Sequence, residues 1–203
     1  VLDLTAAPGS KTTQMAALMN NAGKITAFEK DSVRYQKLLA NLRYQGVLNT
    51  EAHNIDSLGA WRDYFEKFDK VLLDAPCSAE GRFHATRAKT YKYWNQVKVK
   101  NMAKKQKGLI RTAFSCLKPG GLLVYSTCTF SPEENESVVN YLLRKFPGCC
   151  SIEPVRINLR STMPALSFWN GVSFNPGLKN CIRIIPNGIM EGFFVALIRK
   201  MSS

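Results

Sequence analysis

The stretch Asp3-Leu4-Thr5-Ala6-Ala7-Pro8-Gly9-Ser10-Lys11-Thr12 decides the fold of this 203-residue chain. Residues 1–4 are typical of the end of a buried strand, and Pro8 with Gly9 marks a tight turn. From Thr12 onward the apolar residues recur at helical spacing. The sequence therefore predicts a strand, a turn and a helix N-terminus, where free backbone N–H groups and the positive end of the helix dipole can meet a ligand.

Two nucleotide-type interpretations of this turn compete. A phosphate-binding P-loop needs Gly directly before Lys and another Gly five positions earlier. This chain has Ser10 before Lys11 and Thr5 at the first glycine position, which disfavours the P-loop. The other interpretation is the first strand and turn of an S-adenosylmethionine-dependent methyltransferase. Ten residues alone do not exclude an ordinary strand-to-helix turn of an α/β protein.

Strand patterns and helix patterns alternate along most of the chain. The periodicities predict strands over residues 24–28, 50–55, 68–73, 122–126, 181–185 and 193–199, and helices over 12–19, 32–45, 58–65, 95–117 and 132–146. Such alternation predicts an α/β fold with a parallel sheet and right-handed crossovers. The last helix is predicted to begin with a capping box, Ser131-Pro132-Glu133-Glu134. Residues 151–180 show weak periodicity and are predicted to be loop with one or two short elements.

Acidic residues follow three of these predicted strands. Glu29 ends the second strand, where a carboxylate can bind ribose hydroxyls, although a surface acid is the alternative. Asp56 follows the third strand and suits a helix N-cap and a contact to an adenine amino group equally well. The fourth strand ends in Asp74-Ala75-Pro76-Cys77-Ser78. Because ligands of parallel sheets bind at the carboxyl ends of strands, we expect Asp74 and Cys77 beside the first turn.

The net charge of +13 indicates a polyanionic partner, and the charge is concentrated in one segment. Residues 81–132 contain no Asp or Glu but hold 11 of the 28 Lys and Arg residues. The loop over residues 81–94 adds Phe83, Tyr91, Tyr93 and Trp94, and basic with aromatic residues suit a single-stranded nucleic acid with unstacked bases. A solvated helix face is the simpler alternative, but an acid-free run of this length favours contact with a phosphate backbone.

The cysteine pattern gives no sign of a metal site or of a secreted disulfide framework. The six cysteines include no Cys-x-x-Cys pair, and the chain has two His, so we expect no metal. Reduced thiols suit an intracellular protein, either cytoplasmic or nuclear and nucleolar. No apolar run approaches a membrane-spanning length, so we expect no membrane partner, and we expect a monomer. Because Val1 already lies inside a predicted strand, we expect a longer parent protein.

Five motifs occur in a fixed order along nearly the whole chain. They are Asp3–Thr12, Glu29 with Arg34, Asp74–Ser78, Ser126-Thr127-Cys128-Thr129 with Pro132-Glu133-Glu134-Asn135-Glu136, and Gly192-Phe193-Phe194-Val195-Ala196. The chain resembles the catalytic domain of the Sun-domain (NSUN-type) RNA cytosine-5 methyltransferases, and the paired Pro-Cys and Thr-Cys motifs are the specific part of the resemblance. It implies a class I (Rossmann-like) fold with a doubly wound, mostly parallel, seven-stranded sheet whose last strand is antiparallel. Residues 1–203 would form one catalytic domain, without the upstream or RNA-binding segment of the family.

The resemblance also implies a role for each site residue. Thr5, Ala6, Ala7, Pro8, Gly9, Ser10 and Lys11 would bind S-adenosylmethionine, with Thr5 and Ser10 standing where many members have Cys and Gly. Glu29 would replace the family's usual Asp on the ribose, with Arg34 nearby. Asp56 would face the adenine, and Asp74 would line the pocket for cofactor and base. Cys128 would be the nucleophile, and Cys77 would help to release the product.

A cysteine suits this chemistry because cytosine C5 is a poor nucleophile. A thiolate that adds to C6 turns the ring into an enamine, whose C5 can attack a methyl group. The implied function is therefore methylation of cytosine C5 in RNA, either tRNA or rRNA. Two alternatives stay open: an inactive RNA-binding or assembly module on a methyltransferase scaffold, and a DNA cytosine-5 methyltransferase. In the DNA enzyme Cys77 would be the nucleophile, and the Thr-Cys motif would have no role.

Overall fold

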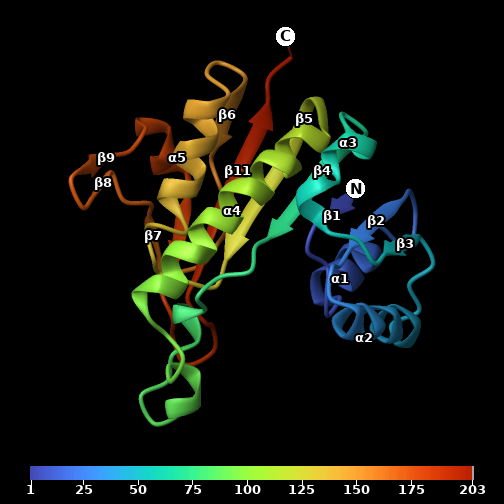
Figure 1. Cartoon of the computed structure of the whole chain (residues 1–203), viewed down its shortest axis with the longest axis horizontal. Helices are drawn as coiled ribbons and strands as arrows, with labels where there is room; N and C mark the ends of the chain where they lie inside the picture. The colour runs from blue at the N-terminus through green and yellow to red at the C-terminus, as the bar shows by residue number, and fades with distance from the viewer. Residues whose placement is uncertain (203) are drawn as a thin grey trace.

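The first two thirds of the chain build the parallel part of one sheet in the computed structural model, which describes residues 1–202 (Figure 1). The elements are β1 (Leu2–Asp3), α1 (Ser10–Leu18), β2 (Ile25–Phe28), α2 (Ser32–Tyr44), β3 (Thr50–His53), α3 (Trp61–Tyr64), β4 (Phe68–Asp74), α4 (Gln96–Cys116) and β5 (Leu117–Thr127). The strands pair in the order β3-β2-β1-β4-β5, and all four pairings are parallel. The strand order reverses between β1 and β4, which is where doubly wound sheets bind ligands.

The rest of the chain forms an antiparallel edge. Its elements are α5 (Glu136–Lys145), β6 (Cys150–Glu153), β7 (Thr162–Pro164), β8 (Phe168–Trp169), β9 (Val172–Ser173), β10 (Ile182–Ile184) and β11 (Phe193–Lys200). Strand β11 pairs antiparallel with β5, β10 and β7 follow it outward, β6 also pairs with β11, and β8 with β9 forms a separate hairpin. The predicted α/β fold is confirmed. The prediction of seven strands is wrong, because the sheet formed by the described residues has nine. Strands as short as β6 and β7 show too little alternation to be recognised.

Helices cover both faces of the sheet, as the two hydrophobic clusters show. Phe28 on β2 belongs to the larger cluster, which includes Ile110 of α4. The preceding residue, Ala27, belongs to the smaller cluster with Leu38 and Leu42 of α2. Because successive side chains of a strand point to opposite faces, α2 and α4 lie on opposite sides of the sheet (Figure 1). This is the doubly wound arrangement that the alternation of elements predicts.

Two predicted element boundaries need correction. Residues 118–121, which lie between the predicted helix over 95–117 and the predicted strand over 122–126, belong to β5 as an irregularity, since Phe68 pairs with Leu117 and Lys70 already pairs with Leu122. The predicted helix over residues 58–65 is divided into the 3-10 turn η1 (Ser57–Gly59) and α3.

Within residues 1–202, no helix has both the length and the apolar character needed to cross a membrane.

The capping box predicted for the last helix does not form. Helix α5 begins at Glu136, and its N-cap residue Asn135 makes no side-chain capping bond. Ser131 Oγ donates to Glu133 Oε2 at 2.7 Å instead. The Glu134 carboxylate accepts the backbone N–H of Ser78, with Oε2 at 3.0 Å. The motif therefore contributes to the loops at the carboxyl edge of the sheet and not to the helix terminus.

Candidate active site

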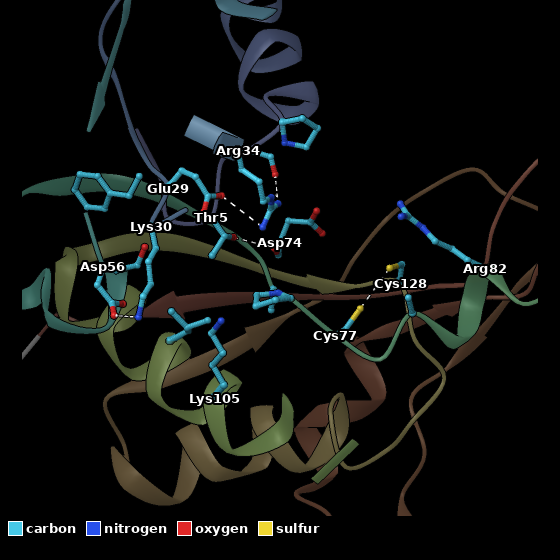
Figure 2. Close-up of a pocket in the computed structure, with 18 residues that line it drawn as sticks. Thr5, Glu29, Lys30, Arg34, Asp56, Asp74, Cys77, Arg82, Lys105 and Cys128 are labelled. Carbon is cyan, nitrogen blue, oxygen red and sulfur yellow. Dashed lines mark hydrogen bonds and ion pairs between the residues drawn. The ribbon is translucent and has the colours of Figure 1, made fainter. Parts of the chain in front are cut away.

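A cavity of about 340 Å³ opens at the carboxyl ends of the parallel strands (Figure 2). It is lined by Thr5, Ala7, Pro8, Phe28, Glu29, Lys30, Arg34, Asp56, Ser57, Asp74, Ala75, Pro76, Cys77, Ala79, Arg82, Lys105, Leu109 and Cys128. A smaller cavity of about 210 Å³ shares part of this lining and continues along the first turn to Ala6, Ser10 and Lys11. Of the predicted site residues, only Gly9 lines neither cavity. The strand ends thus bring the predicted residues together.

The first turn is fastened to the end of β4. Thr5 Oγ1 donates to the backbone oxygen of Asp74 at 2.8 Å, which confirms that Asp74 lies beside the turn. Gly9 has φ 108° and ends the turn directly before α1, and a Cβ there would lie 3.0 Å from a methyl carbon of Leu38. Glycine is required at this position by both the left-handed backbone and the close contact with α2. The N-terminus of α1, at Ser10, then faces the smaller cavity.

Glu29 is a buried carboxylate with one oxygen available to the cavity. Its side chain is 7% exposed, and Oε1 accepts the backbone N–H of Asp31 at 2.8 Å. Oε2 lies 3.6 Å from Arg34 Nη1, so the expected proximity of Glu29 and Arg34 is confirmed. Arg34 also donates through Nη2 to the backbone oxygen of Ala7, which ties α2 to the first turn. This geometry leaves Oε2 free to accept a ligand hydroxyl.

Asp56 is both an N-cap and a cavity residue. Its Oδ1 accepts the backbone N–H of Leu58 at 3.1 Å, capping η1. Its Oδ2 lies 2.5 Å from Lys30 Nζ, and this hydrogen bond holds the pKa of the Asp56 carboxyl below its usual value. Of the two interpretations of Asp56, the N-cap is confirmed, while the adenine contact stays a prediction.

Asp74 is held from two sides at the boundary between the cavities. Its Oδ2 lies 2.6 Å from Lys11 Nζ, and its Oδ1 accepts from Ser126 Oγ at 2.8 Å. Deeper in the same edge, Asp3 is fully buried and accepts from Thr12 Oγ1 at 2.7 Å. Burial raises the pKa of Asp3 to about 6. Asp74 is thus an anchored carboxylate that still faces the cavity.

The two predicted cysteines meet at the cavity. Their Sγ atoms lie 3.3 Å apart, and Cys77 and Cys128 come from the loops after β4 and β5 (Figure 2). The hydrogen bond from Cys77, assisted by the positive charge of Arg82, lowers the pKa of Cys128 to about 7. The pKa of Cys77 is raised, because its proton is held between the two sulfurs and its thiol is largely buried. Cys128 is therefore the thiol that ionises first.

Arg82 is a site residue that the sequence reasoning missed. It follows Gly81 in the 3-10 turn η2 (Glu80–Arg82) and extends toward the cysteine pair (Figure 2). Gly81 donates to the backbone oxygen of Cys128, and Gly192 donates to the backbone oxygen of Gly81, each at 3.0 Å. The guanidinium is tied to Glu191 at 2.9 Å. The only sequence signal was an Arg directly after Gly81, among many basic residues.

The lysines of α4 point to different sides of the helix. Lys105 lines the main cavity and extends toward it (Figure 2). Lys107 lines a separate cavity of about 510 Å³ with Tyr141, Arg144 and Lys145. Gln106 between them is fully buried. The basic segment predicted from the sequence is therefore not one continuous face. Within residues 1–202 no group of three or more His, Cys, Asp or Glu side chains suits a metal ion.

Comparison with known proteins gives consistent matches over the whole chain. The family described as 16S rRNA methyltransferase RsmB/F matches residues 1–199. Ribosomal RNA small subunit methyltransferase F of Vibrio campbellii is 43% identical, over 100% of this chain and 40% of its own length. The tRNA (cytosine(49)-C(5))-methyltransferase of Pyrococcus abyssi is also 43% identical, over 98% of this chain and 63% of its own length. The chain thus spans about two fifths of the first relative and less than two thirds of the second.

Solved structures give the same grouping. A methyltransferase homolog protein from Pyrococcus horikoshii superposes with a TM-score of 0.83 at 37% identity, over 98% of this chain and 61% of the other. NSun6 from Pyrococcus horikoshii, solved with SFG, superposes with a TM-score of 0.80 at 34% identity, over 100% of this chain and 48% of the other. An S-adenosylmethionine-dependent O-methyltransferase from Thermotoga maritima, at 14% identity and a TM-score of 0.56, shares the Rossmann-like fold. The predicted fold and resemblance are confirmed: the chain belongs to the RsmB/F family of methyltransferases, with the Sun-domain enzymes.

Proposed function

We propose that the parent protein of this chain methylates C5 of cytosine in RNA, through a covalent bond between Cys128 and C6 of the base. The observation that carries the proposal is the pair of thiols 3.3 Å apart at the cavity, of which one has a pKa lowered to about 7. A binding module would need neither thiol. Family membership and the named activities of the relatives support the same reaction.

The cavities suit S-adenosylmethionine, which supplies the methyl group when bound. Glu29 Oε2 can accept ribose hydroxyls, since Arg34 lies no closer than 3.6 Å. Asp56 offers an acceptor for the adenine amino group at the rim. The first turn and the start of α1 would hold the amino-acid end, with backbone N–H groups directed at its carboxylate. These are the roles that we assign to Thr5–Lys11, Glu29, Arg34 and Asp56.

The base would enter beside Asp74 and the cysteines. The Lys11–Asp74 pair provides an acceptor that orients the exocyclic amino group and a donor for a hydrogen bond to ring N3, and the bond to N3 withdraws electrons from C6. The Cys128 thiolate then forms the bond to C6, and the electron pair of the C5–C6 double bond moves to C5. C5 would then take the methyl group of S-adenosylmethionine, as the bond from that methyl group to the sulfonium sulfur breaks and its electron pair stays on the sulfur. Because C6 must be reached from outside the stack, the target base has to be unpaired or flipped out.

Cys77 would act once Cys128 is bonded to the base. While Cys128 is a thiolate, a second negative charge 3.3 Å away is costly, and this keeps Cys77 protonated. In the thioether the charge is gone, so Cys77 can release its proton to solvent and, as a thiolate, accept the C5 proton. The C5–H electron pair then restores the C5–C6 double bond and expels Cys128 as thiolate. The charge of Arg82 acts more strongly on Cys128 than on Cys77, and this supports the assignment over the DNA-enzyme alternative, in which Cys77 would attack.

We further propose an RNA partner contacted by the basic segment, and a catalytic domain within a longer intracellular protein. The Vibrio relative is named for ribosomal RNA and the Pyrococcus relative for tRNA, so both substrate classes should be tested. The test is bisulfite sequencing of tRNA and rRNA from cells with and without the intact gene. We expect one or a few cytosines to lose methylation without the gene and to regain it with wild type, but not with Cys128→Ala. Unchanged methylation of all cytosines would refute the proposed function.

A further inference from the structure

A buried hydrogen-bonded bridge lies beneath the loop that carries Cys77. Glu134 and Gln106 are both fully buried. Glu134 Oε2 accepts from the backbone N–H of Ser78 at 3.0 Å and from Gln106 Nε2 at 2.8 Å. The same Gln106 Nε2 donates to the backbone oxygen of Pro76 at 2.9 Å. The backbone groups on either side of Cys77 are therefore both held by this bridge.

The bridge joins three parts of the chain. Gln106 comes from the middle of α4, Glu134 from the segment after β5, and the Cys77 loop from the end of β4. Ser78 Oγ also shares a hydrogen bond of 2.8 Å with Thr129 Oγ1, next to Cys128. Because Cys77 lies outside regular secondary structure, these bonds determine where its thiol sits relative to Cys128.

Burying Glu134 and Gln106 lowers the stability of the fold relative to burying apolar side chains. Burial raises the pKa of Glu134 against the lowering effect of its hydrogen bonds from Ser78 and Gln106. Gln106 Oε1 is buried and has no hydrogen-bond partner among the described residues. Apolar residues of similar volume would avoid both costs, and a buried polar group is otherwise a burden. The polar pair instead makes directional hydrogen bonds, which fix the Ser78 N–H and the Pro76 backbone oxygen in place.

We propose that Glu134 and Gln106 are positioning residues for the release step. They hold the Cys77 thiol within reach of both Cys128 and the C5 proton of the bound base. This inference rests on the proposed function, in which Cys77 removes that proton. It predicts that loosening the bridge slows release of the methylated base more than it slows attack by Cys128, since the bridge contacts the Cys77 loop directly.

The test uses full-length protein carrying Glu134→Gln or Gln106→Met. In Glu134→Gln an NH2 group in place of Oε2 would face the two donors of Ser78 and Gln106, whereas an NH2 group in place of Oε1 would face the Ser78 N–H at 3.3 Å, so at least the Oε1 contact is lost. Gln106→Met keeps the volume and removes both donors. Each variant is mixed with RNA and methyl-labelled S-adenosylmethionine, and denaturing gels separate free RNA from protein-bound RNA. We expect release about tenfold to a hundredfold slower, with a methylated RNA–protein band, because small misplacements of a reacting group have effects of this size.

Glu136→Gln is the matched control. Glu136 is equally buried and lies two residues along, but it binds Arg183 at 2.7 Å and the N–H of Leu166 at 2.9 Å, away from the Cys77 loop. We expect it to lose stability without trapping RNA. Cys77→Ala is the positive control, and its failure to trap RNA would refute the proposed role of Cys77 instead. A trapped band in Cys77→Ala, with normal release in both bridge variants, would overturn the inference. If Glu134→Gln does not fold, Gln106→Met decides.

Discussion

Replacing Cys77 with Ala should raise the pKa of the Cys128 thiol, because the hydrogen bond from Cys77 is the largest influence that lowers it. Burial raises that pKa and Arg82 lowers it, so without Cys77 we expect a value near the ordinary 9.0 instead of about 7. At pH 7 the ionised fraction then falls from about one half to about one hundredth, roughly fiftyfold. The Cys128 thiolate of the variant is, however, a better nucleophile than that of wild type, by about eightfold for a rise of two pKa units.

Because of these two effects, the alkylation rates of Cys128 in the variant and in wild type should cross as the pH rises. At pH 7 the variant should react with iodoacetamide about sixfold more slowly than wild type, and above pH 10 about eightfold faster. The rate is measured by mass spectrometry of the peptide that contains Cys128, since the chain has six cysteines. Cys77→Ser is the matched control: its hydroxyl still donates, so the midpoint should stay well below that of Cys77→Ala. Equal midpoints near pH 7 in wild type and Cys77→Ala would refute the reasoning.

Three further predictions test other parts of the site. Glu29→Ala removes an acceptor for the ribose and should weaken binding of S-adenosylmethionine by about 1.5–3 kcal/mol in calorimetry, while ATP should give no heat with either form; an unchanged affinity would exclude the ribose role. Lys105→Glu should weaken both RNA binding and methylation, because Lys105 lines the main cavity, whereas Lys107→Glu should weaken RNA binding alone. RNA affinity is measured by titration at several salt concentrations, and affinities equal to that of wild type in both variants would mean that both lysines are merely solvated. The buried Asp3, whose pKa is raised to about 6 from 3.8, is neutral at low pH and charged at an unfavourable cost above pH 6, so stability from this group falls as the pH rises from about 4 to about 6. Asp3→Asn should remove up to about 3 kcal/mol of that fall, measured as the difference in urea unfolding free energy between pH 4 and pH 7.5, and parallel pH curves would contradict it.

The parts of the site that lie at strand ends could be predicted from the sequence. Asp74 ends β4, Cys77 follows it, and Cys128 follows β5, so the shared edge of parallel strands predicts that they lie together without any knowledge of packing. Glu29 follows β2 for the same reason. In each case a local pattern predicts the strand, and the parallel arrangement of the strands predicts that their carboxyl ends lie at the same edge of the sheet.

The parts that depend on contacts distant in sequence could not be predicted. Glu134 matches a capping box, but its carboxylate turns toward Ser78, a residue 56 positions earlier. Arg82 lies near the cysteines because the backbone of Gly81 is bonded to Cys128 and Gly192, and its side chain bonds Glu191, a residue 109 positions later. The strands β6 and β7 exist because an existing edge offers free backbone groups, and short segments accept such pairing whatever their own pattern.

The contact between Gly81 and Gly192 restricts how this protein can change over generations. A Cβ at Gly81 would lie 2.1 Å from the Gly192 oxygen, and a Cβ at Gly192 would lie 2.0 Å from the Phe130 ring. A substitution at either glycine alone would therefore clash with backbone or with a packed aromatic ring. Residues 83–94 extend beyond this fixed point and are mostly exposed, and within them Phe83 packs against Tyr91 and Trp94. Substitutions in that loop can therefore change its exposed surface while its point of attachment beside Cys128 stays the same.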